Sequence, residues 1–405
     1  MPQVICDLHI HSRFARGCSK DTTIENLEKY ARIKGINLLG TGDFQHPEWN
    51  KEIKANTIEK EGILRTKTGF PFVWSTEISL MYTQGGKGRR IHFVILAPDT
   101  ASADKFISEL SKKGRLDYDG RPIFGFSAIE LMNMLIAISK KFIVIPAHIW
   151  TPYFGILGSK SGFDSVEECF GENSKYIYAL EMGLSSNPQM NRRLSSLDKY
   201  HLVAFSDSHS YWPWRIGREV TAFDMHELTY DSLFDAIKNG KIKFTLGVDP
   251  AYGIYHYDGH SDCKVCMSPK ESLAVNDICP ICKKQMTLGV AHRVEALANR
   301  PENYSAKDKP DFKEMLPLHE IIAAYIDVKQ IASKKVWEIY NKLIKNFETE
   351  FNILVNANAE ELKKFIPEKL VDLIIKNRSN QLYVSPGFDG QYGQLKIEHQ
   401  TKLEL

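Results

Sequence analysis

A recurring pattern in the first 210 residues limits what this chain can fold into more than any other feature. Seven short apolar segments each end in a side chain that can bind a metal ion. Imidazole nitrogens and carboxylate oxygens are the atoms that Zn, Mn and Fe(II) bind in proteins, and a site for several ions needs about eight to ten of them. The pattern therefore predicts that the ends of the segments meet around metal ions. The candidate ligands are His9 and His11, Asp43 and His46, Glu77, His92, His148, Glu181, and Asp207 and His209.

The spacing of two pairs of these side chains supports this prediction. His9 and His11 are two residues apart, as are Asp207 and His209, and residues two apart on a strand face the same side. A single histidine beside an apolar strand is more often a core or surface residue, so His92 alone would favour that interpretation. The two pairs together favour the metal site.

Strand-like and helix-like segments alternate along the same region. Residues 21–34 carry apolar side chains at helical spacing, and residues 36–44 form an apolar run that predicts a buried strand. This alternation predicts parallel strands covered by helices and closed, or nearly closed, into a barrel, with functional groups at the carboxyl ends of the strands. Residues 74–82 and 89–96, which a glycine-rich segment separates, are expected to pair as a hairpin. Further helices are expected over residues 127–141, 187–200 and 229–240.

The composition indicates a globular protein with a large core. The chain has 405 residues, of which 43% are hydrophobic and 25% are charged, enough for one large core and one or two smaller units. Its apolar runs are much shorter than the roughly 18 residues that a membrane span requires, and the first ligand motif begins too early to leave room for a signal peptide. We therefore expect no membrane partner and a cytoplasmic location.

The net charge does not by itself indicate a nucleic-acid partner. Lys and Arg together number 52, and Asp and Glu number 50, so the chain as a whole is nearly neutral. Basic side chains do cluster locally, where they either lie on solvated loops or contact the phosphate groups of a substrate. The clusters are Lys87, Arg89 and Arg90; Lys112, Lys113 and Arg115; Arg192 and Arg193; and Arg215 and Arg218.

Four of the seven cysteines form two CxxC motifs separated by twelve residues. Two such turns can place four thiolates at the corners of a tetrahedron, which is the geometry of a structural zinc site. A closed site of this kind leaves no position for a substrate, so we expect one structural zinc ion that folds a small ribbon over residues 251–290. The expected ligands are Cys263, Cys266, Cys279 and Cys282.

Residues 291–405 are expected to form a third, mainly helical unit. Residues 318–332 and 333–347 have amphipathic helical patterns, whereas the charged segment 306–315 is typical of a surface loop or linker. Such a unit either docks on the barrel and stabilises it or, together with the ribbon, forms a clamp over duplex DNA.

The motifs DLHIHS, TGDF, PAH and SDSH, together with the segment around Glu77, resemble the PHP (polymerase and histidinol phosphatase) family of metal-dependent phosphoesterases. The resemblance covers residues 1–250 and implies an α/β fold, a distorted (β/α)7-type barrel. The cysteine ribbon and the helical region behind it are similar to the endonuclease Q group of this family, which acts in DNA repair. This implies a metal-dependent endodeoxyribonuclease that cuts double-stranded DNA on the 5′ side of deaminated bases (uracil, hypoxanthine or xanthine) or abasic sites. Single-stranded DNA and repair or replication-clamp proteins are further candidate partners.

The resemblance also implies how the ligands divide among two or three divalent ions, which would be Zn, Mn or Mg. One ion would be held by His9, His11, Glu77 and Asp207. The second would share Glu77 with the first and would also be held by His92 and His148. A third would be served by Asp43 and His209. The chain has no histidine soon after His11 and has Asp43 where many family members have a histidine, which leaves open whether a third ion binds and whether His46 contributes.

Two divalent cations about 4 Å apart can hold a phosphate group, lower the pKa of a bound water towards about 7 and stabilise the attacking and leaving oxygens. We therefore expect phosphoester hydrolysis, with Glu77, His148 and Asp207 as catalytic residues. Asp207 would act either as a ligand or as the acceptor of a proton from the water, and the sequence does not separate these roles. Side chains from the basic clusters would neutralise the phosphate oxygens.

Aromatic side chains that follow the ligand segments are expected to line the mouth of the site. Their rings would either stack on a base turned out of the duplex or pack as the lid of the barrel. These side chains are Trp150, Tyr153, Tyr211 and Trp212. Ser186 and Asn187 offer hydroxyl and amide groups that could recognise the edge of such a base, although Asn187 is also placed to cap the helix that begins at Pro188.

Two other functions fit parts of the sequence. A phosphatase acting on a small phosphorylated metabolite would use the same ligands but would not need the ribbon or the helical region. A non-catalytic, metal-stabilised module of a repair or replication assembly would not need so many converging ligands. The endonuclease interpretation accounts for all three regions.

Overall fold

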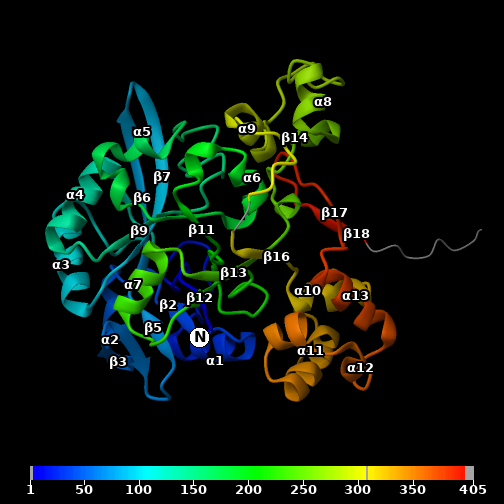
Figure 1. Ribbon diagram of the computed structural model, residues 1–405, viewed down its shortest axis with the longest axis horizontal. Helices are drawn as coiled ribbons and strands as arrows, with labels where there is room; N and C mark the ends of the chain where they lie inside the picture. The colour runs from blue at the N-terminus through cyan, green and yellow to red at the C-terminus, as the bar shows by residue number, and fades with distance from the viewer. Residues whose placement is uncertain (1–2, 307–308, 397–405) are drawn as a thin grey trace, which may run out of the picture.

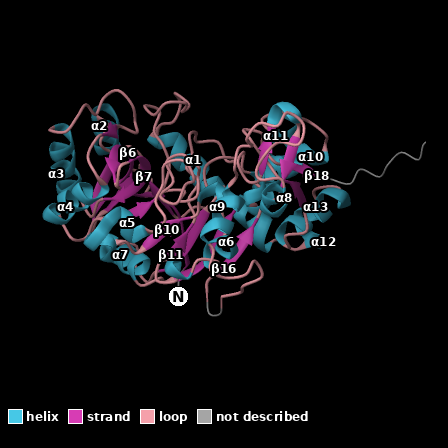
Figure 2. Ribbon diagram, turned by 90° about the horizontal axis from the view of Figure 1, so that it is seen from above, coloured by secondary structure: helices cyan, strands magenta, loops and turns pink. Residues whose placement is uncertain are grey.

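The computed structural model describes residues 3–306 and 309–396. These residues form an α/β fold whose sheets lie inside a layer of helices (Figure 1). The view from above shows the same arrangement, with the strands enclosed between helices (Figure 2). The helices of this layer are α1 (Ile24–Lys34), α2 (Pro47–Asn56), α3 (Thr100–Ser111), α4 (Ala128–Ile138), α5 (Val166–Phe170), α6 (Pro188–Arg192) and α7 (Tyr230–Lys238). Within the described residues, every helix is too short or too polar to cross a bilayer.

The largest sheet contains eight strands and includes the first strand of the chain. Their order is β16 (Asp311–Glu314), β13 (Ile242–Gly247), β12 (Val220–Asp224), β1 (Gln3–Asp7), β2 (Leu38–Gly40), β5 (Pro71–Val73), β4 (Ile63–Thr66) and β3 (Thr57–Lys60). β1 is parallel to β2, and β2 is parallel to β5, as the alternation of strands and helices predicts. β12, on the other side of β1, runs antiparallel to it.

A second sheet is built on the hairpin that the sequence predicts for residues 74–82 and 89–96. β6 (Ser75–Gln84) and β7 (Lys87–Leu96) pair antiparallel along their whole length. β8 (Ile123–Phe124) and β9 (Ile143–Pro146) flank this hairpin. A third sheet holds two parallel strands, β10 (Ala179–Glu181) and β11 (His201–Val203). Strand pairing among the described residues thus gives separate sheets, and the closed barrel stays a prediction.

The helix expected over residues 187–200 is interrupted, whereas three other expected helices form as α1, α4 and α7. α6 ends at Arg192, and a 3₁₀ turn over Ser195–Leu197 follows it. Leu194, between them, has extended dihedral angles of φ −103° and ψ 111°. The guanidinium of Arg192 donates hydrogen bonds to the carbonyl oxygens of Leu197 and Tyr200, so the segment turns back on itself instead of continuing as a helix.

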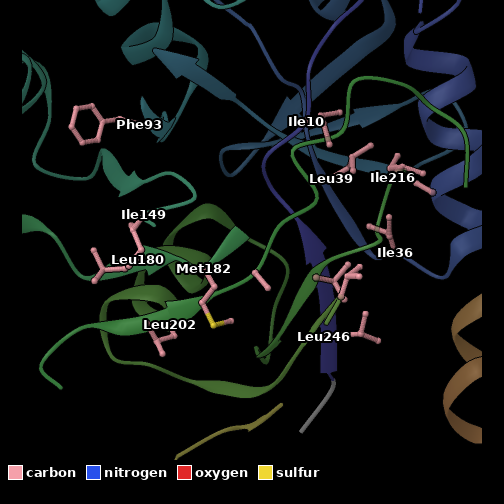
Figure 3. Close-up of a cluster of buried hydrophobic side chains, with 14 of the residues drawn as sticks. Ile10, Ile36, Leu39, Phe93, Ile149, Leu180, Met182, Leu202, Ile216 and Leu246 are labelled. Atoms are coloured by element: carbon pink, nitrogen blue, oxygen red, sulfur yellow. The ribbon is translucent and has the colours of Figure 1, made fainter. Parts of the chain in front are cut away.

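Both faces of the central strands are buried. Leu38 and Leu39 of β2 belong to different apolar clusters, as do Val94 and Phe93 of β7. Because successive side chains on a strand point to opposite faces, one cluster lies on each side of these strands. Figure 3 shows Leu39 and Phe93 within the larger cluster. Burial on both faces explains why these strands are continuous apolar runs rather than alternating ones.

The region after β13 contains the ribbon and a helical unit, which both lie to the right of the sheets in Figure 1. β14 (Asp258–His260) pairs with β15 (Val265–Met267), and helices α8 (Pro269–Ala274) and α9 (Val290–Leu297) follow. The helical unit contains α10 (Leu318–Tyr325), α11 (Lys334–Phe347), α12 (Ala359–Leu362) and α13 (Glu368–Arg378). Behind it, β17 (Tyr383–Ser385) and β18 (Gln394–Lys396) form a hairpin.

The segment 306–315, expected to be a surface loop or linker, is partly a strand. Within it, β16 pairs in parallel with β13, and Phe312 lies opposite Thr245. The pairing is favourable because the apolar ring of Phe312 packs against the main core. The chain therefore returns from the ribbon to the edge of the largest sheet before it reaches α10. The expected domain bounds of 1–250, 251–290 and 291–405 stay a prediction.

Candidate metal centre

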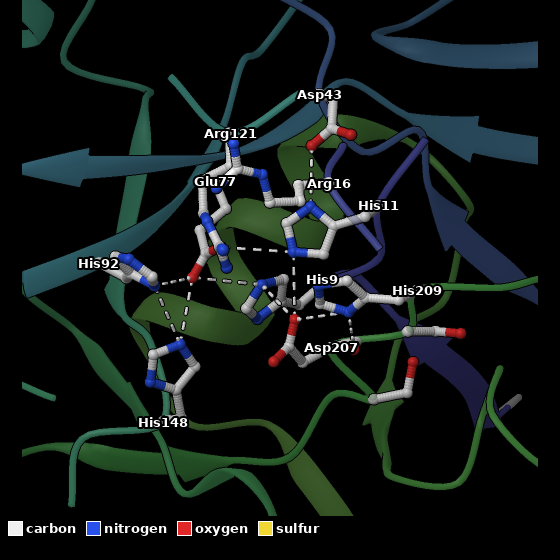
Figure 4. A network of polar contacts seen from close by, with 12 residues as sticks. His9, His11, Arg16, Asp43, Glu77, His92, Arg121, His148, Asp207 and His209 are labelled. Atoms are coloured by element: carbon white, nitrogen blue, oxygen red, sulfur yellow. Dashed lines mark hydrogen bonds and ion pairs between the residues drawn. The ribbon is translucent and has the colours of Figure 1, made fainter. Parts of the chain in front are cut away.

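Two sets of buried side chains that can bind metal ions meet at Glu77 (Figure 4). In each set, one ligand atom from every residue lies within 4.8 Å of the others. The first set contains His9, His11, Glu77 and Asp207. The second set contains Glu77, His92 and His148. These are the sets that the resemblance to the PHP family implies for the first two ions.

Four of the ligands stand after strands that are far apart in the sequence. His9 and His11 follow β1, His148 follows β9 and Asp207 follows β11. His148 and Asp207 have left-handed backbone angles, with φ values of 32° and 46°. Residues other than glycine seldom adopt this conformation, and where they do it often marks a functional site. The sharp turns at these strand ends direct the side chains into a common space.

Glu77 links the two sets because it lies on the hairpin beside His92. His92 is opposite Ser79 on the paired strand, and Ser79 and Glu77 share one face because side chains alternate along a strand. The Oε1 atom of Glu77 is 2.8 Å from Nδ1 of His92 and 3.1 Å from Nε2 of His148. Its Oε2 atom is 3.3 Å from Nε2 of His11. Oε2 of Glu77 therefore faces the first set, whereas Oε1 contacts the second set and also lies 3.6 Å from Nε2 of His9 in the first.

The first set has the spacing of ligands around one ion. Oδ1 of Asp207 is 3.1 Å from Nε2 of His11 and 3.5 Å from Nε2 of His9. Ligands at zinc distances on a tetrahedron are about 3.4 Å from each other. Nε2 of His9 is buried and has no hydrogen-bond partner among the described residues. An unpaired buried nitrogen of this kind is costly, and a metal ion would satisfy it, so the residues fit the ion that the resemblance implies.

The electrostatics also fit a cation. Burial alone would raise the pKa values of Glu77 and Asp207, but neighbouring histidines, and Arg121 in the case of Glu77, hold both below their usual values. Burial lowers the pKa of His92 to about 4, so its ring is neutral and offers a lone pair at neutral pH. Burial would also lower the pKa of His9, but the surrounding carboxylates raise it well above its usual value. A cation that binds there displaces a proton, as is usual for metal sites.

Two carboxylates at strand ends act behind the ligand sets rather than within them. Both oxygens of Glu181 accept from Nδ1 of His9, at 2.9 and 3.0 Å, and Oε2 also accepts from the backbone N–H of His148 at 2.8 Å. Oδ1 of Asp43 accepts from Nδ1 of His11 at 3.0 Å. Such contacts fix the ring tautomer, so Nε2 of both histidines faces the metal space. The strand-end pattern includes both carboxylates but does not distinguish this role from direct ligation.

A third ligand set around Asp43 and His209 is not present among the described residues. Besides His11, Asp43 binds the backbone N–H of Ser12 at 2.6 Å, so both of its oxygens have partners. Nδ1 of His209 is 3.7 Å from Oδ1 of Asp207. The ring of His46 stacks on Phe14, with a centroid distance of 4.1 Å. A third ion, with or without His46, stays a prediction.

The structure adds Arg121 to the site. Its Nη1 atom donates to Oε2 of Glu77 at 3.0 Å, and the residue belongs to the loop before β8. No feature of the sequence distinguishes this arginine from other surface arginines. Two arginines of the expected basic clusters are used elsewhere: Arg89 pairs with Glu168, and Arg192 holds its own loop.

Most of the residues expected to bind substrate are engaged inside the protein. Trp150 is fully buried and its indole N–H donates to Oδ1 of Asn191 at 2.8 Å, so its ring packs in the core and is not accessible to a base. Tyr211 and Trp212 are mostly enclosed, and the ring of Trp212 packs against Trp337 of α11. This contact joins the loop after Asp207 to the helical unit.

The remaining expected substrate residues divide between internal and exposed positions. Ser186 is buried, and its hydroxyl donates to the carbonyl oxygen of Met182. Asn187 caps α6 by accepting from the backbone N–H of Met190 at 3.0 Å. Tyr153 exposes 46% of its surface and is the member of the expected group with the most accessible ring.

The structure brings three of the four expected cysteines together with a histidine. The set consists of His260, Cys263, Cys279 and Cys282. Cys266 does not belong to this set, because β15 turns its side chain outwards, and the four-cysteine site stays a prediction. His260 lies opposite Val265 in the β14–β15 pair, and Val265 is buried against Cys279 in the ribbon core. Cys266 is the next residue along β15, so it points to the exposed face. The set fits one structural zinc ion.

Comparison with known proteins finds similarity by sequence both to a domain family and to whole proteins. Residues 317–381, within the helical unit, match the family described as the MJ0043 C-terminal domain. The uncharacterized protein MJ0043 of Methanocaldococcus jannaschii is 30% identical over 256 residues, which make up 62% of this chain and 32% of that protein. The matched region thus spans about a third of the length of that relative.

Two solved structures match the whole fold. The lesion-specific endonuclease PfuEndoQ from Pyrococcus furiosus aligns with a TM-score of 0.88 and 28% identity, over 100% of this chain and 98% of that one. Endonuclease Q in complex with a 27-mer duplex substrate that has an abasic lesion at the active site aligns with a TM-score of 0.87 and 28% identity, over 100% of this chain and 99% of that one.

The fold and the buried sets define an α/β protein with His, Glu and Asp side chains suited to metal ions. Within that class, the structure closely matches endonuclease Q over its full length. The resemblance to endonuclease Q is therefore confirmed.

Proposed function

We propose that this chain is a metal-dependent DNA repair endonuclease that hydrolyses the phosphodiester bond on the 5′ side of a deaminated base or an abasic site. The observation that carries the proposal is that two buried ligand sets share Glu77 in a fold that follows the endonuclease Q structures from end to end. One of those structures holds a duplex with an abasic lesion at its active site.

When bound at these sets, Zn, Mn or Mg ions would lower the pKa of a water and neutralise charge on the phosphate. The first set would hold one ion and the second set another, with Glu77 common to both. Glu181 fixes the ring of His9, and Asp43 fixes the ring of His11, so the ligands need little rearrangement on binding. Asp207 is ionised and its side chain is 29% exposed. It would either hold an ion or accept a proton from a water on the open side of the site.

The regions behind the catalytic fold would bind the DNA. The ribbon and the helical unit would form a clamp over the duplex, which a small metabolite would not need. Tyr153 follows the ligand His148 closely and is well exposed, so its ring would stack on a base turned out of the helix. Such an enzyme would work where the chromosomal DNA is, with repair or replication proteins as candidate partners.

The test is a nicking assay on end-labelled duplexes that carry uracil, hypoxanthine, xanthine or an abasic site, with Mn, Mg or Zn added in turn. We expect a nick on the 5′ side of the lesion and none in the undamaged duplex. Removal of metal with a chelator should abolish the nicking. Asp207→Asn should lower the rate of cleavage by about 1,000-fold or more, because the carboxylate acts on the reacting groups. The variant should still bind the duplex.

Two outcomes would contradict the proposal. Release of phosphate from histidinol phosphate or a chromogenic monoester without nicking would indicate a metabolite phosphatase. Inactivity on both kinds of substrate, in a protein that holds its metal ions, would indicate a non-catalytic module.

A further inference from the structure

Arg121 lies at the edge of the metal centre with its guanidinium against Glu77 (Figure 4). The side chain is 29% exposed, whereas Glu77 is fully buried. The guanidinium therefore touches the shared ligand, and the side chain that carries it is partly open to solvent. A substrate that reaches the metal centre from the open side would pass this group.

The loop that carries Arg121 is held rigidly on the metal centre. The backbone N–H of Gly120 donates to the carbonyl oxygen of Phe14 at 3.0 Å, and its own carbonyl oxygen accepts from Nε2 of Gln45 at 2.6 Å. A Cβ atom at Gly120 would lie 2.3 Å from Oδ2 of Asp43. The backbone of Gly120 therefore lies closer to the Asp43 carboxylate than any other residue type would permit. Oδ1 of Asp119 also accepts from the backbone N–H of Arg121 at 3.0 Å. The base of the Arg121 side chain thus has a fixed position.

The guanidinium of Arg121 has unused donors. An arginine offers five N–H donors in a planar fork, and among the described residues the recorded acceptor for Arg121 is Glu77, through Nη1 alone. Arg89 differs, since its three nitrogens donate to Gln84, Gly162 and Glu168. The Nε and Nη2 donors of Arg121 therefore remain for a ligand.

The geometry points to Arg121 as the residue that binds a non-bridging oxygen of the scissile phosphate. This inference rests on the proposed function, because it takes the substrate to be a DNA phosphodiester. A guanidinium matches two phosphate oxygens better than a lysine does, since its donors lie in one plane at a fixed spacing. Glu77 orients the group in the free protein, and the fixed loop keeps it there. The interaction would strengthen as negative charge builds on the phosphate.

The test measures whether Arg121 contributes to the binding of the negatively charged phosphate. Two abasic duplexes are compared by fluorescence anisotropy in Ca²⁺: one has a normal linkage at the cleavage position, and the other has a neutral methylphosphonate there. The wild-type protein should bind the normal duplex more tightly. Arg121→Gln should lose most of this preference, and it should lower kcat/KM for nicking in Mn²⁺ by about 100-fold, as the loss of one preorganised donor does. Arg121→Lys should recover part of the preference for the charged linkage and part of the kcat/KM for nicking.

Arg32→Gln is the matched control, because Arg32 is 49% exposed and pairs with Glu28. It should keep the wild-type affinity ratio and nicking rate. An Arg121→Gln variant that keeps the full preference for the charged linkage would overturn the assignment, and Arg121→Met supplies the same comparison if the glutamine variant does not fold. The affinity ratio decides the role of Arg121 even without nicking, so failure of cleavage contradicts only the proposed function. Failure of the wild-type protein to bind either duplex would overturn both.

Discussion

The ammonium group of Lys34 lies 2.7 Å from the carboxylate of Glu350, and both side chains are buried. Lys34 also donates to the carbonyl oxygen of Pro213 at 2.8 Å, in the loop that carries Asp207 and His209. On the other side, Glu350 accepts from the backbone N–H of Leu318 and from the hydroxyl of Tyr340. This network ties the helical unit to the loop of the metal ligands.

Lys34→Met should therefore destabilise the protein strongly. Removing one partner of a buried ion pair costs about 3–5 kcal/mol, because the remaining charge stays buried without compensation. The free energy of unfolding, measured in urea, should fall by about 3 kcal/mol. Lys51→Met is the control, since Lys51 pairs with Glu48 on the surface, and exposed pairs contribute about 0–1 kcal/mol. Equal losses in the two variants would contradict the role of the buried pair.

Substitutions of Glu77 and of His92 should change the metal content of the protein by different amounts. Glu77 belongs to both ligand sets, whereas His92 belongs to the second alone. Glu77→Gln should remove two metal ions per chain relative to the wild type, and His92→Ala should remove one. Elemental analysis of the purified variants checks this, with the exposed Glu48→Gln as a control that keeps every ion. If Glu77→Gln and His92→Ala lost the same number, Glu77 would not be shared.

Strand periodicity predicted that the ligand side chains would meet, whereas the resemblance to the PHP family implied how they divide into sets. His9 and His11 had to share a face, and strands joined by helices bring their ends together. Which carboxylates touch the metal could not be anticipated, because Glu181 and Asp43 stand at strand ends as Asp207 does. Only distances show that they bind the far nitrogens of His9 and His11.

Other parts of the site depend on contacts that leave no local pattern. Arg121 belongs to an irregular loop, and its position depends on Gln45 and Phe14, more than 70 residues away. The break after α6 depends on Arg192, whose hydrogen bonds to its own loop have no periodic signal. The same holds for Trp212, whose ring packs on a helix of the distant helical unit.

His260 and Cys266 are the two candidates for the fourth zinc ligand of the ribbon, and substituting each in turn distinguishes them. His260→Ala should lose the structural zinc ion, whereas Cys266→Ser should keep it, because Cys266 points away from the set. Cys279→Ser should behave like His260→Ala and should weaken folding or DNA binding more than it slows bond cleavage. Zinc per chain can be measured by elemental analysis beside the melting temperature. Loss of zinc in Cys266→Ser with retention in His260→Ala would restore the four-cysteine site.

The contact between the helical unit and the ligand loop should also be sensitive to acid through His319. This side chain is fully buried, packs 4.8 Å from Trp214 and 4.6 Å from Trp337 by ring centroids, and has no hydrogen-bond partner among the described residues. Burial, with a smaller contribution from Lys34, lowers its pKa from 6.5 to about 3. Between these values the unfolded chain binds a proton that the folded chain does not, so stability is complete above pH 6.5 and falls as the pH decreases towards 3.

His319→Phe should reduce this acid sensitivity, because a phenyl ring fills the aromatic site without binding a proton. Each such group changes the free energy of unfolding by up to about 1.4 kcal/mol per pH unit within the window. Urea unfolding at pH 7.5, 6 and 5 should therefore give a shallower pH slope in the variant than in the wild type. His226→Gln, at an exposed position, should leave the slope unchanged. A slope in His319→Phe as steep as that of the wild type would show that other groups control the acid response.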